Sequence, residues 1–240
     1  MVVASGNLDS STLAPRNGAA LPHYIAPYAA YVLVLAAPVT LVSRPVAYAL
    51  AWIASVLTLW MGRHFYLPVL RPDRVVLSIL AGLAGGLAGT ILWVALKRPF
   101  YPSGGAAWDP DVFWARLVAS STVVPVFEEL LFRGFILLGV MQWAAARAAR
   151  MPDPLGVALN ESSVREMPAG SWTPLAAGIS TVAFAAGHAP GEWLAACAYG
   201  LLMAALWVAR KDLLTPIVAH ATTNAVLALW VRASGQWSVW

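Results

Sequence analysis

Ionisable and amide side chains are rare in the apolar second half of this sequence, so the few that occur there are candidates for chemistry. They are Glu128, Glu129, Arg133, His188, His220 and Asn224. A carboxylate and an imidazole can together hold and deprotonate a water molecule, while an imidazole and an amide can donate hydrogen bonds to an oxygen that becomes negative. Such a set suffices for hydrolysis of a peptide bond without a serine or cysteine nucleophile.

The two glutamates point in different directions on a helix, because adjacent residues are about 100° apart. Glu129 and Arg133 are four residues apart with the acid first, which is the favourable order for an ion pair and makes burial of the arginine tolerable. Glu128 has no such partner within its own helix. We therefore expect Glu129 and Arg133 to form a structural pair and Glu128 to be the general base.

The two histidines in the later apolar stretches belong to further pairs with helical spacing. His188 follows Phe184 by four residues, and Asn224 follows His220 by four residues, so each pair shares one helical face. Three helices would then supply one polar cluster. Taken singly, His188 is equally well an interfacial group, and His220 with Asn224 equally well a hydrogen-bonded contact between helices.

The composition indicates an integral membrane protein. Of the 240 residues, 60% are hydrophobic and 11% are charged, and the mean hydropathy is +0.70, whereas soluble domains average roughly 45–50% apolar and about 25% charged residues. The net charge of +4 comes mostly from arginines in short polar stretches, as in loops that face anionic lipid, which argues against nucleic-acid binding. A single cysteine, Cys197, excludes an internal disulfide.

We expect an all-α fold, a polytopic transmembrane helix bundle of seven or eight spans with an intramembrane polar cavity. A polar N-terminal tail, residues 1–23, precedes a single transmembrane domain, residues 24–240, in which the segments 62–74, 99–111 and 150–171 carry charges or helix breakers and are predicted loops. The predicted spans are 24–43, 46–61, 75–96, 112–149, 172–187, 193–209 and 214–231.

The stretch 112–149 is too long for one simple crossing. At about 1.5 Å per residue its length as a helix is about 57 Å, against about 30 Å for the hydrocarbon core of a bilayer. We expect an interfacial or tilted lead-in that kinks near Pro125 into a true span, or a division into two spans. With seven spans the lysines and arginines outside the spans favour a cytoplasmic N-terminus, and with eight the sidedness reverses.

The span 75–96 contains glycines at overlapping four-residue spacings, namely Gly82, Gly85, Gly86 and Gly89. Small residues at this spacing let a neighbouring helix approach closely. We expect packing within the chain, and the alternative is a homodimer through Gly82, Gly86 and Gly89.

With these motifs the sequence resembles the CPBP family of intramembrane endopeptidases, which includes CAAX prenyl protease-like, bacteriocin-processing and abortive-infection-type membrane proteins. The family pattern EExxxR reads EELLFR at 128–133, FxxxH reads FAAGH at 184–188, and HxxxN reads HATTN at 220–224. The three motifs lie in order on successive apolar stretches, within about 112–231. The first 110 residues resemble the family only as additional spans.

The resemblance implies that Glu128 and His188 activate water, that His220 and Asn224 stabilise the oxyanion, and that Arg133 orients the glutamate pair. Glu129 and Phe184 complete the motifs in supporting roles. It implies glutamate catalysis without a cofactor or metal, since no HExxH helix arranges ligands here. The alternative is a zinc ion held by Glu128, His188 and His220.

The expected function is therefore hydrolysis of a peptide bond near the membrane surface of a small or lipid-tethered protein or peptide. We expect a multi-pass protein of the bacterial inner (cell) membrane that contacts membrane lipid. Two alternatives remain: a non-catalytic immunity or scaffold protein that keeps the polar cluster for packing, and a proton-coupled transporter, whose relays also use buried carboxylates and histidines. The second is disfavoured because the halves of the sequence show no repeat.

Overall fold

The computed structural model describes residues 14–70, 72–101 and 104–240. The helices are α1 (Asn17–Leu35), α2 (Arg44–Leu70), α3 (Val75–Lys97), α4 (Pro110–Glu129), α5 (Leu137–Ala148), α6 (Pro154–Gly156), α7 (Pro174–Ala186), α8 (Trp193–Arg210) and α9 (Leu214–Ser234). Short 3₁₀ and π-helical segments join some of them, and these described parts contain no strand. The fold is all-helical, as the sequence predicts.

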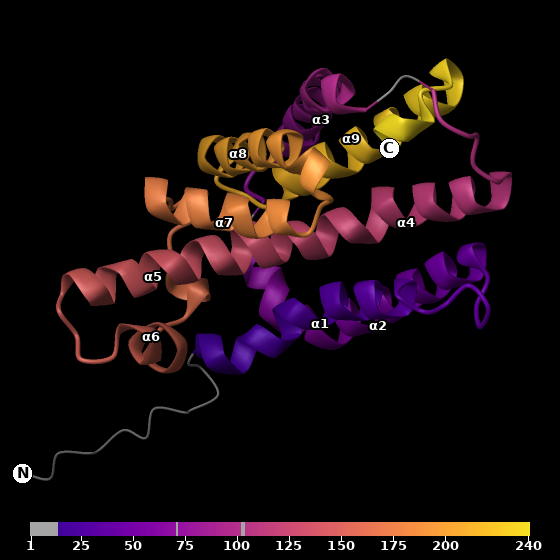
Figure 1. Cartoon of the computed structure of the whole chain (residues 1–240). Helices are drawn as coiled ribbons and strands as arrows, with labels where there is room; N and C mark the ends of the chain where they lie inside the picture. Colours follow the sequence, from indigo (N-terminus) through magenta and orange to yellow (C-terminus); the bar gives the residue numbers. More distant parts are fainter. Residues whose placement is uncertain (1–13, 71, 102–103) are drawn as a thin grey trace, which may run out of the picture.

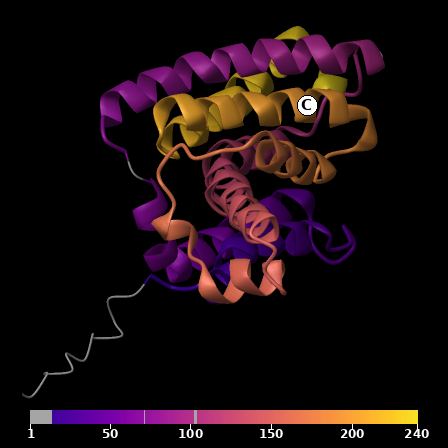
Figure 2. The same ribbon diagram turned by 90° about the vertical axis from the view of Figure 1, so that its left-hand side faces the viewer.

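A long central rod organises the molecule. Helices α4 and α5 lie end to end along it, with the α1–α2 hairpin on one side and helices α3, α8 and α9 on the other (Figure 1). In the view turned by 90° the rod is seen nearly end-on between these two groups (Figure 2). Helix α7 packs against α8 and α5. The rod therefore has one face toward the hairpin and another toward the C-terminal helices.

Five helices are long and apolar enough to cross a membrane. These candidate spans are Asn17–Leu35, Arg44–Tyr66, Val75–Phe100, Pro190–Arg210 and Leu214–Ser234. Helix α7 is a shorter apolar helix of the described chain. This result supports an integral multi-pass membrane protein.

The boundary of the N-terminal tail differs from the prediction of 1–23. Residues 1–13 lie outside the described part of the chain, and α1 already begins at Asn17. Asn17 is buried. Its side-chain amide donates to Ala158 O at 2.7 Å, and its side-chain oxygen accepts from the Val164 N–H at 2.7 Å. These contacts tie the start of α1 to the 150–171 segment, which a reading of local polarity does not detect.

The predicted loop at 62–74 is wrong over most of its length, because α2 continues to Leu70. The His23 ring stacks on Phe65 with 4.1 Å between ring centroids, and Leu70 O accepts from the Leu213 N–H at 3.1 Å. Charges end an apolar pattern without ending a helix, since the backbone hydrogen bonds of a helix need no apolar surroundings.

The rod explains how the long stretch 112–149 is accommodated. Asp109 caps α4 by accepting from the Asp111 and Val112 N–H groups at 2.9 and 3.3 Å, as a preferred N-cap residue does. The helix then passes through Pro125, the predicted position of a kink, as an α-helix. A π-helical segment, Leu130–Ile136, follows instead and leads into α5. Such segments are frequent at functional sites.

The glycines of α3 face helices of the same chain. A Cβ atom on Gly82, Gly86 or Gly89 would come within 3 Å of Val218, Thr222 or Thr223 on α9. Glycine is therefore required for the close approach of α3 and α9, as expected for packing within the chain. A homodimer through these three glycines would have to displace α9.

Candidate active site

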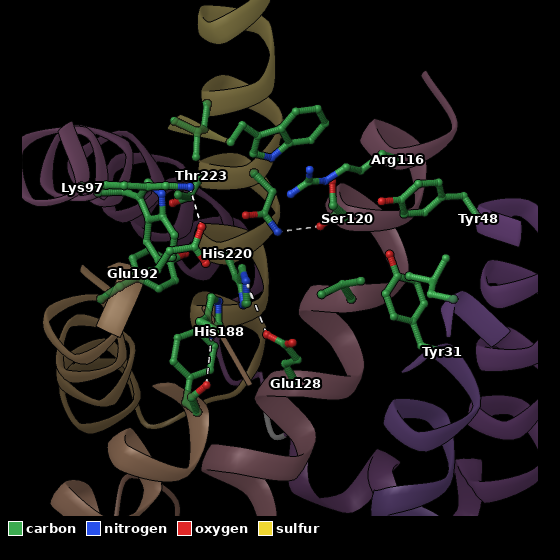
Figure 3. Close-up of a pocket in the computed structure, with 18 residues that line it drawn as sticks. Tyr31, Tyr48, Lys97, Arg116, Ser120, Glu128, His188, Glu192, His220 and Thr223 are labelled. Atoms are coloured by element: carbon green, nitrogen blue, oxygen red, sulfur yellow. Dashed lines mark hydrogen bonds and ion pairs between the residues drawn. The ribbon is translucent and has the colours of Figure 1, made fainter. Parts of the chain in front are cut away.

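One face of α4 lines a pocket of about 380 Å³ between the hairpin and the C-terminal helices. Arg116, Ser120, Val124 and Glu128 all line it, because residues at four-residue spacing share one side of a helix. The opposite wall comes from α3, α7, α8 and α9 (Figure 3). The rod thus presents a row of side chains along one pocket.

Five of the residues singled out from the sequence line this pocket. They are Glu128, Phe184, His188, His220 and Asn224. Figure 3 shows Glu128, His188 and His220 around one space, with Glu128 from α4, His220 from α9 and His188 from the turn after α7. The two remaining residues, Glu129 and Arg133, are fully buried beside it. The structure therefore brings the three motifs together at one place.

Glu129 and Arg133 form the predicted ion pair. Their closest atoms, Oε1 and Nη1, are 3.1 Å apart, and both side chains have no exposed surface. Arg133 also donates through Nη2 to Gly200 O on α8 at 2.9 Å. Because the two buried charges compensate each other, removal of either partner would leave a buried charge without its main counter-ion.

His220 lies between the two glutamates, which the sequence does not predict. Its Nδ1 is 2.9 Å from Glu129 Oε1, and its Nε2 is 3.8 Å from Glu128 Oε2. With an ionised Glu129 accepting, Nδ1 carries the proton. This contact sets the ring orientation and directs Nε2 toward Glu128. Glu129 therefore does more than neutralise Arg133, since it also holds the imidazole.

His188 is held by its own motif. Its Nδ1 lies 3.1 Å from Phe184 O, and the two rings are 4.8 Å apart at their centroids. A carbonyl oxygen only accepts, so Nδ1 donates and the neutral ring keeps Nε2 as an acceptor. The Trp193 indole donates to His188 O at 3.1 Å and fixes the turn after α7. His188 lies in the turn just after α7 rather than on its face, and the Phe184 carbonyl sets the tautomer of its ring.

Asn224 connects α9 to the rod. Its side-chain amide donates to Ser120 O at 2.7 Å. An amide group has two N–H hydrogens, so one remains for another acceptor in the pocket. Asn224 is thus both a contact between helices and a donor at the pocket wall, which unites the two interpretations that the sequence leaves open.

The pocket also contains charged residues that the sequence analysis does not single out. Lys97, at the end of α3, is buried and pairs with Glu192 at 2.5 Å between Nζ and Oε1. Glu192 Oε2 also accepts from the Ala189 N–H at 3.3 Å, next to His188. Arg116 lines the far end of the same pocket. Lys97 and Glu192 lie between predicted spans and Arg116 lies near the start of one, so all three resemble ordinary flanking charges in the sequence.

A metal site is the remaining alternative for Glu128, His188 and His220. Within the described ranges no three His, Cys, Asp or Glu side chains are grouped so that they could hold a metal ion. His220 Nδ1 is engaged by Glu129 and His188 Nδ1 by Phe184 O, which leaves the Nε2 atom of each ring for other partners. The chemistry below is derived from the side chains alone.

Comparison with known proteins supplies a family for this part of the chain. Residues 110–226 match the family described as type II CAAX prenyl endopeptidase Rce1-like. The match includes all three motifs and begins at α4, so α1 to α3 lie outside it. No curated protein and no solved structure matches the chain.

Proposed function

Since residues 110–226 belong to the Rce1-like family of CAAX prenyl endopeptidases, we propose that this protein is an intramembrane endopeptidase of the glutamate type. Its substrate is a small or lipid-tethered protein, cleaved at a peptide bond near the membrane surface. The family supports a CAAX-type endopeptidase. The observation that carries the proposal is the shared pocket of Glu128, His188 and His220, with Glu128 Oε2 3.8 Å from His220 Nε2.

Glu128 and His188 activate the attacking water in this proposal. The neutral His188 ring offers Nε2 as an acceptor because Nδ1 faces Phe184 O. Glu128 takes a proton from the water as its oxygen attacks the carbonyl carbon, and the same proton passes to the leaving amine nitrogen when the C–N bond breaks. The glutamate is then regenerated as a carboxylate.

His220 and Asn224 stabilise the negative oxygen of the tetrahedral intermediate. Asn224 contributes the amide hydrogen that Ser120 O does not take. His220 contributes Nε2 in its protonated form, with Nδ1 donating to Glu129. Arg133 acts indirectly, because it fixes Glu129, and Glu129 in turn holds the His220 imidazole. Preorganised donors of this kind typically contribute about 10²–10³-fold each.

The bilayer in this proposal covers more than the five long apolar helices. Helix α7 is apolar but short, and the α4–α5 rod carries the site, so their inclusion gives the seven or eight predicted spans and makes the pocket an intramembrane cavity. The location in a bacterial inner membrane and a homodimer through α3 also stay predictions. Spin-label depth measurements at α7 and α5 would test the span count.

The decisive test is Glu128→Gln in the purified full-length protein in lipid nanodiscs. Glutamine keeps the size and hydrogen bonding of the side chain but cannot take a proton, so we expect cleavage of a membrane-tethered peptide to fall about 10²–10⁴-fold. The matched control is Glu161→Gln, at an exposed position outside the pocket, with unchanged rates. Equal cleavage by Glu128→Gln and the parent protein would overturn the proposal.

Glu128→Gln also distinguishes the endopeptidase from the two alternative functions when it is tested in cells. A scaffold or immunity protein keeps its cellular function in Glu128→Gln, because the packing is preserved. A proton-coupled transporter instead loses substrate uptake into proteoliposomes while no peptide is cut. Loss of cleavage together with loss of the cellular function supports the endopeptidase.

A further inference from the structure

One of the charged side chains that line the pocket has no hydrogen-bond or ion-pair partner in the described part of the chain. Its lining includes two cationic side chains, Lys97 and Arg116, and two carboxylates, Glu128 and Glu192. Lys97 is paired with Glu192, and Glu128 faces His220. Arg116 makes no hydrogen bond or ion pair with any residue in the described part of the chain. A partly buried arginine without an anion is costly unless a ligand supplies one.

Two indole rings hold the Arg116 guanidinium in place. Its central carbon lies 4.4 Å from the ring centroid of Trp108 and 4.4 Å from that of Trp240. The two indoles are themselves stacked, with 5.5 Å between their centroids. Cation–π contacts fix the plane of the group while leaving its N–H donors free. The side chain is therefore preorganised and lacks only an acceptor.

The spacing along α4 relates this cation to the proposed reaction. Arg116 and Glu128 are twelve residues apart on one helical face, with Ser120 and Val124 between them, and all four line the pocket. Twelve residues of helix correspond to about 18 Å along the axis. An extended peptide covers that distance with about five residues. A peptide lying along this face, with its reacting bond at Glu128, would reach Arg116 within that length.

We propose that Arg116 binds a carboxylate of the peptide substrate, within about five residues of the bond that is cut. This proposal rests on the proposed function and names a specificity-determining residue for it. The planar guanidinium matches a carboxylate with two parallel hydrogen bonds. That carboxylate belongs to the free C-terminus or to an Asp or Glu side chain, and the two sources are separated by the substrates used.

The first measurement is binding to the full-length Glu128→Gln protein in nanodiscs of zwitterionic lipid, because this variant is expected to cleave only slowly. Three otherwise identical fluorescent peptides are compared: a free acid, a C-terminal amide, and an amide with one glutamate near its end. We expect the free acid to bind about 10- to 100-fold more tightly than the plain amide, as for a hydrogen-bonded charge pair. Rescue by the glutamate would identify a side-chain carboxylate.

The second measurement adds Arg116→Gln and Arg116→Lys to the same protein. The ratio of the affinities for the carboxylate peptide and the plain amide should fall close to one in Arg116→Gln. It should remain above one in Arg116→Lys, which keeps the charge without the planar fork. The matched control is Arg232→Gln, since Arg232 also lies over two aromatic rings, Phe113 and Trp114, but outside the pocket. In the Glu128-containing enzyme Arg116→Gln should raise KM much more than it lowers kcat.

Equal binding of all three peptides by the Glu128→Gln protein would overturn the proposal without any change at Arg116, so it stays testable even where Arg116→Gln fails to fold. An equal loss for all three peptides in Arg116→Gln would also overturn it. So would an Arg116 effect seen only with anionic lipid, because the guanidinium would then bind a lipid phosphate. If the selectivity for a carboxylate is retained but the parent protein cleaves no peptide, the proposed endopeptidase activity is refuted and the binding role of Arg116 is not.

Discussion

Helix α9 contacts two neighbours in opposite ways. Toward α3 it packs against glycines, and toward α4 it presents polar side chains across a pocket. The first contact leaves no room for an added methyl group, whereas the second leaves about 380 Å³. The same helix is thus part of a tight interface and one wall of a cavity.

The tight interface rests on backbone proximity. A Cβ on Gly86 would lie 2.4 Å from Thr222 Cβ and 2.6 Å from Ala219 O. The Thr223 hydroxyl donates to Gly86 O at 2.9 Å. Such close packing replaces the hydrophobic driving force that is absent between helices in lipid. It fixes the backbone position of α9.

The polar interface depends on that fixed position. His220 and Asn224 reach α4 through single hydrogen bonds, to Glu129 and to Ser120 O. A shift of α9 by about 1 Å would break bonds of this length. The glycine contact with α3 therefore keeps the polar face of α9 in register with α4, because one helix carries both contacts.

Arg133→Met should have the largest effect on stability, and it acts on the polar interface. It leaves the buried Glu129 without its cation, so we expect a loss of about 3–5 kcal/mol in the free energy of unfolding. The measurement is denaturant unfolding in mild detergent. Arg147→Met is the control, since Arg147 is exposed and lies over the Trp143 ring, and it should change little.

A second substitution shows whether the unpaired charge of Glu129 causes the loss of stability. Glu129→Gln combined with Arg133→Met removes both charges, so it should recover part of the lost stability. Activity should remain low in the double variant, because His220 loses the carboxylate that orients its ring. Recovery of both stability and activity would contradict a positioning role for Glu129.

Gly86→Ala acts on the tight interface and should destabilise the protein by about 1–3 kcal/mol, as overpacking does. It should also lower activity, since α9 must move away from α3. Gly139→Ala is the matched control, because a Cβ there has nothing within 4 Å and alanine favours a helix. If Gly86→Ala were as active as the parent protein, the coupling between the two faces of α9 would be refuted.

Contacts within one helix were predictable from the sequence. The Glu129–Arg133 ion pair follows from four-residue spacing. The predicted shared helical face of Phe184 and His188 does not hold, because α7 ends at Ala186 and His188 lies in the turn that follows. The contact of Glu129 with His220 joins residues 91 positions apart, and spacing carries no information about how α4 and α9 are placed. The same limit applies to Arg116, because one of its two indole partners, Trp240, comes from the distant C-terminal end of the described chain.

Helix ends show a related limit. The extension of α2 to Leu70 and the start of α1 at Asn17 depend on partners elsewhere in the chain, Leu213 and Val164. The apolar pattern located helices α3, α8 and α9 nearly to the residue, because their ends coincide with charges or glycine. The π-helical segment at Leu130–Ile136 has no such local marker, although it follows the glutamate pair directly.

Asn224→Ala should have the smallest effect on stability and a much larger effect on catalysis. Loss of the hydrogen bond to Ser120 O lowers the free energy of unfolding by about 0.5–1.5 kcal/mol, whereas loss of an oxyanion donor lowers kcat about 10²–10³-fold. The control is Asn160→Ala, at an exposed amide outside the pocket. A role confined to packing predicts a fall in stability with kcat preserved. Because α3 still fixes α9 in this variant, a large fall in kcat at nearly unchanged stability would assign the amide to the reaction.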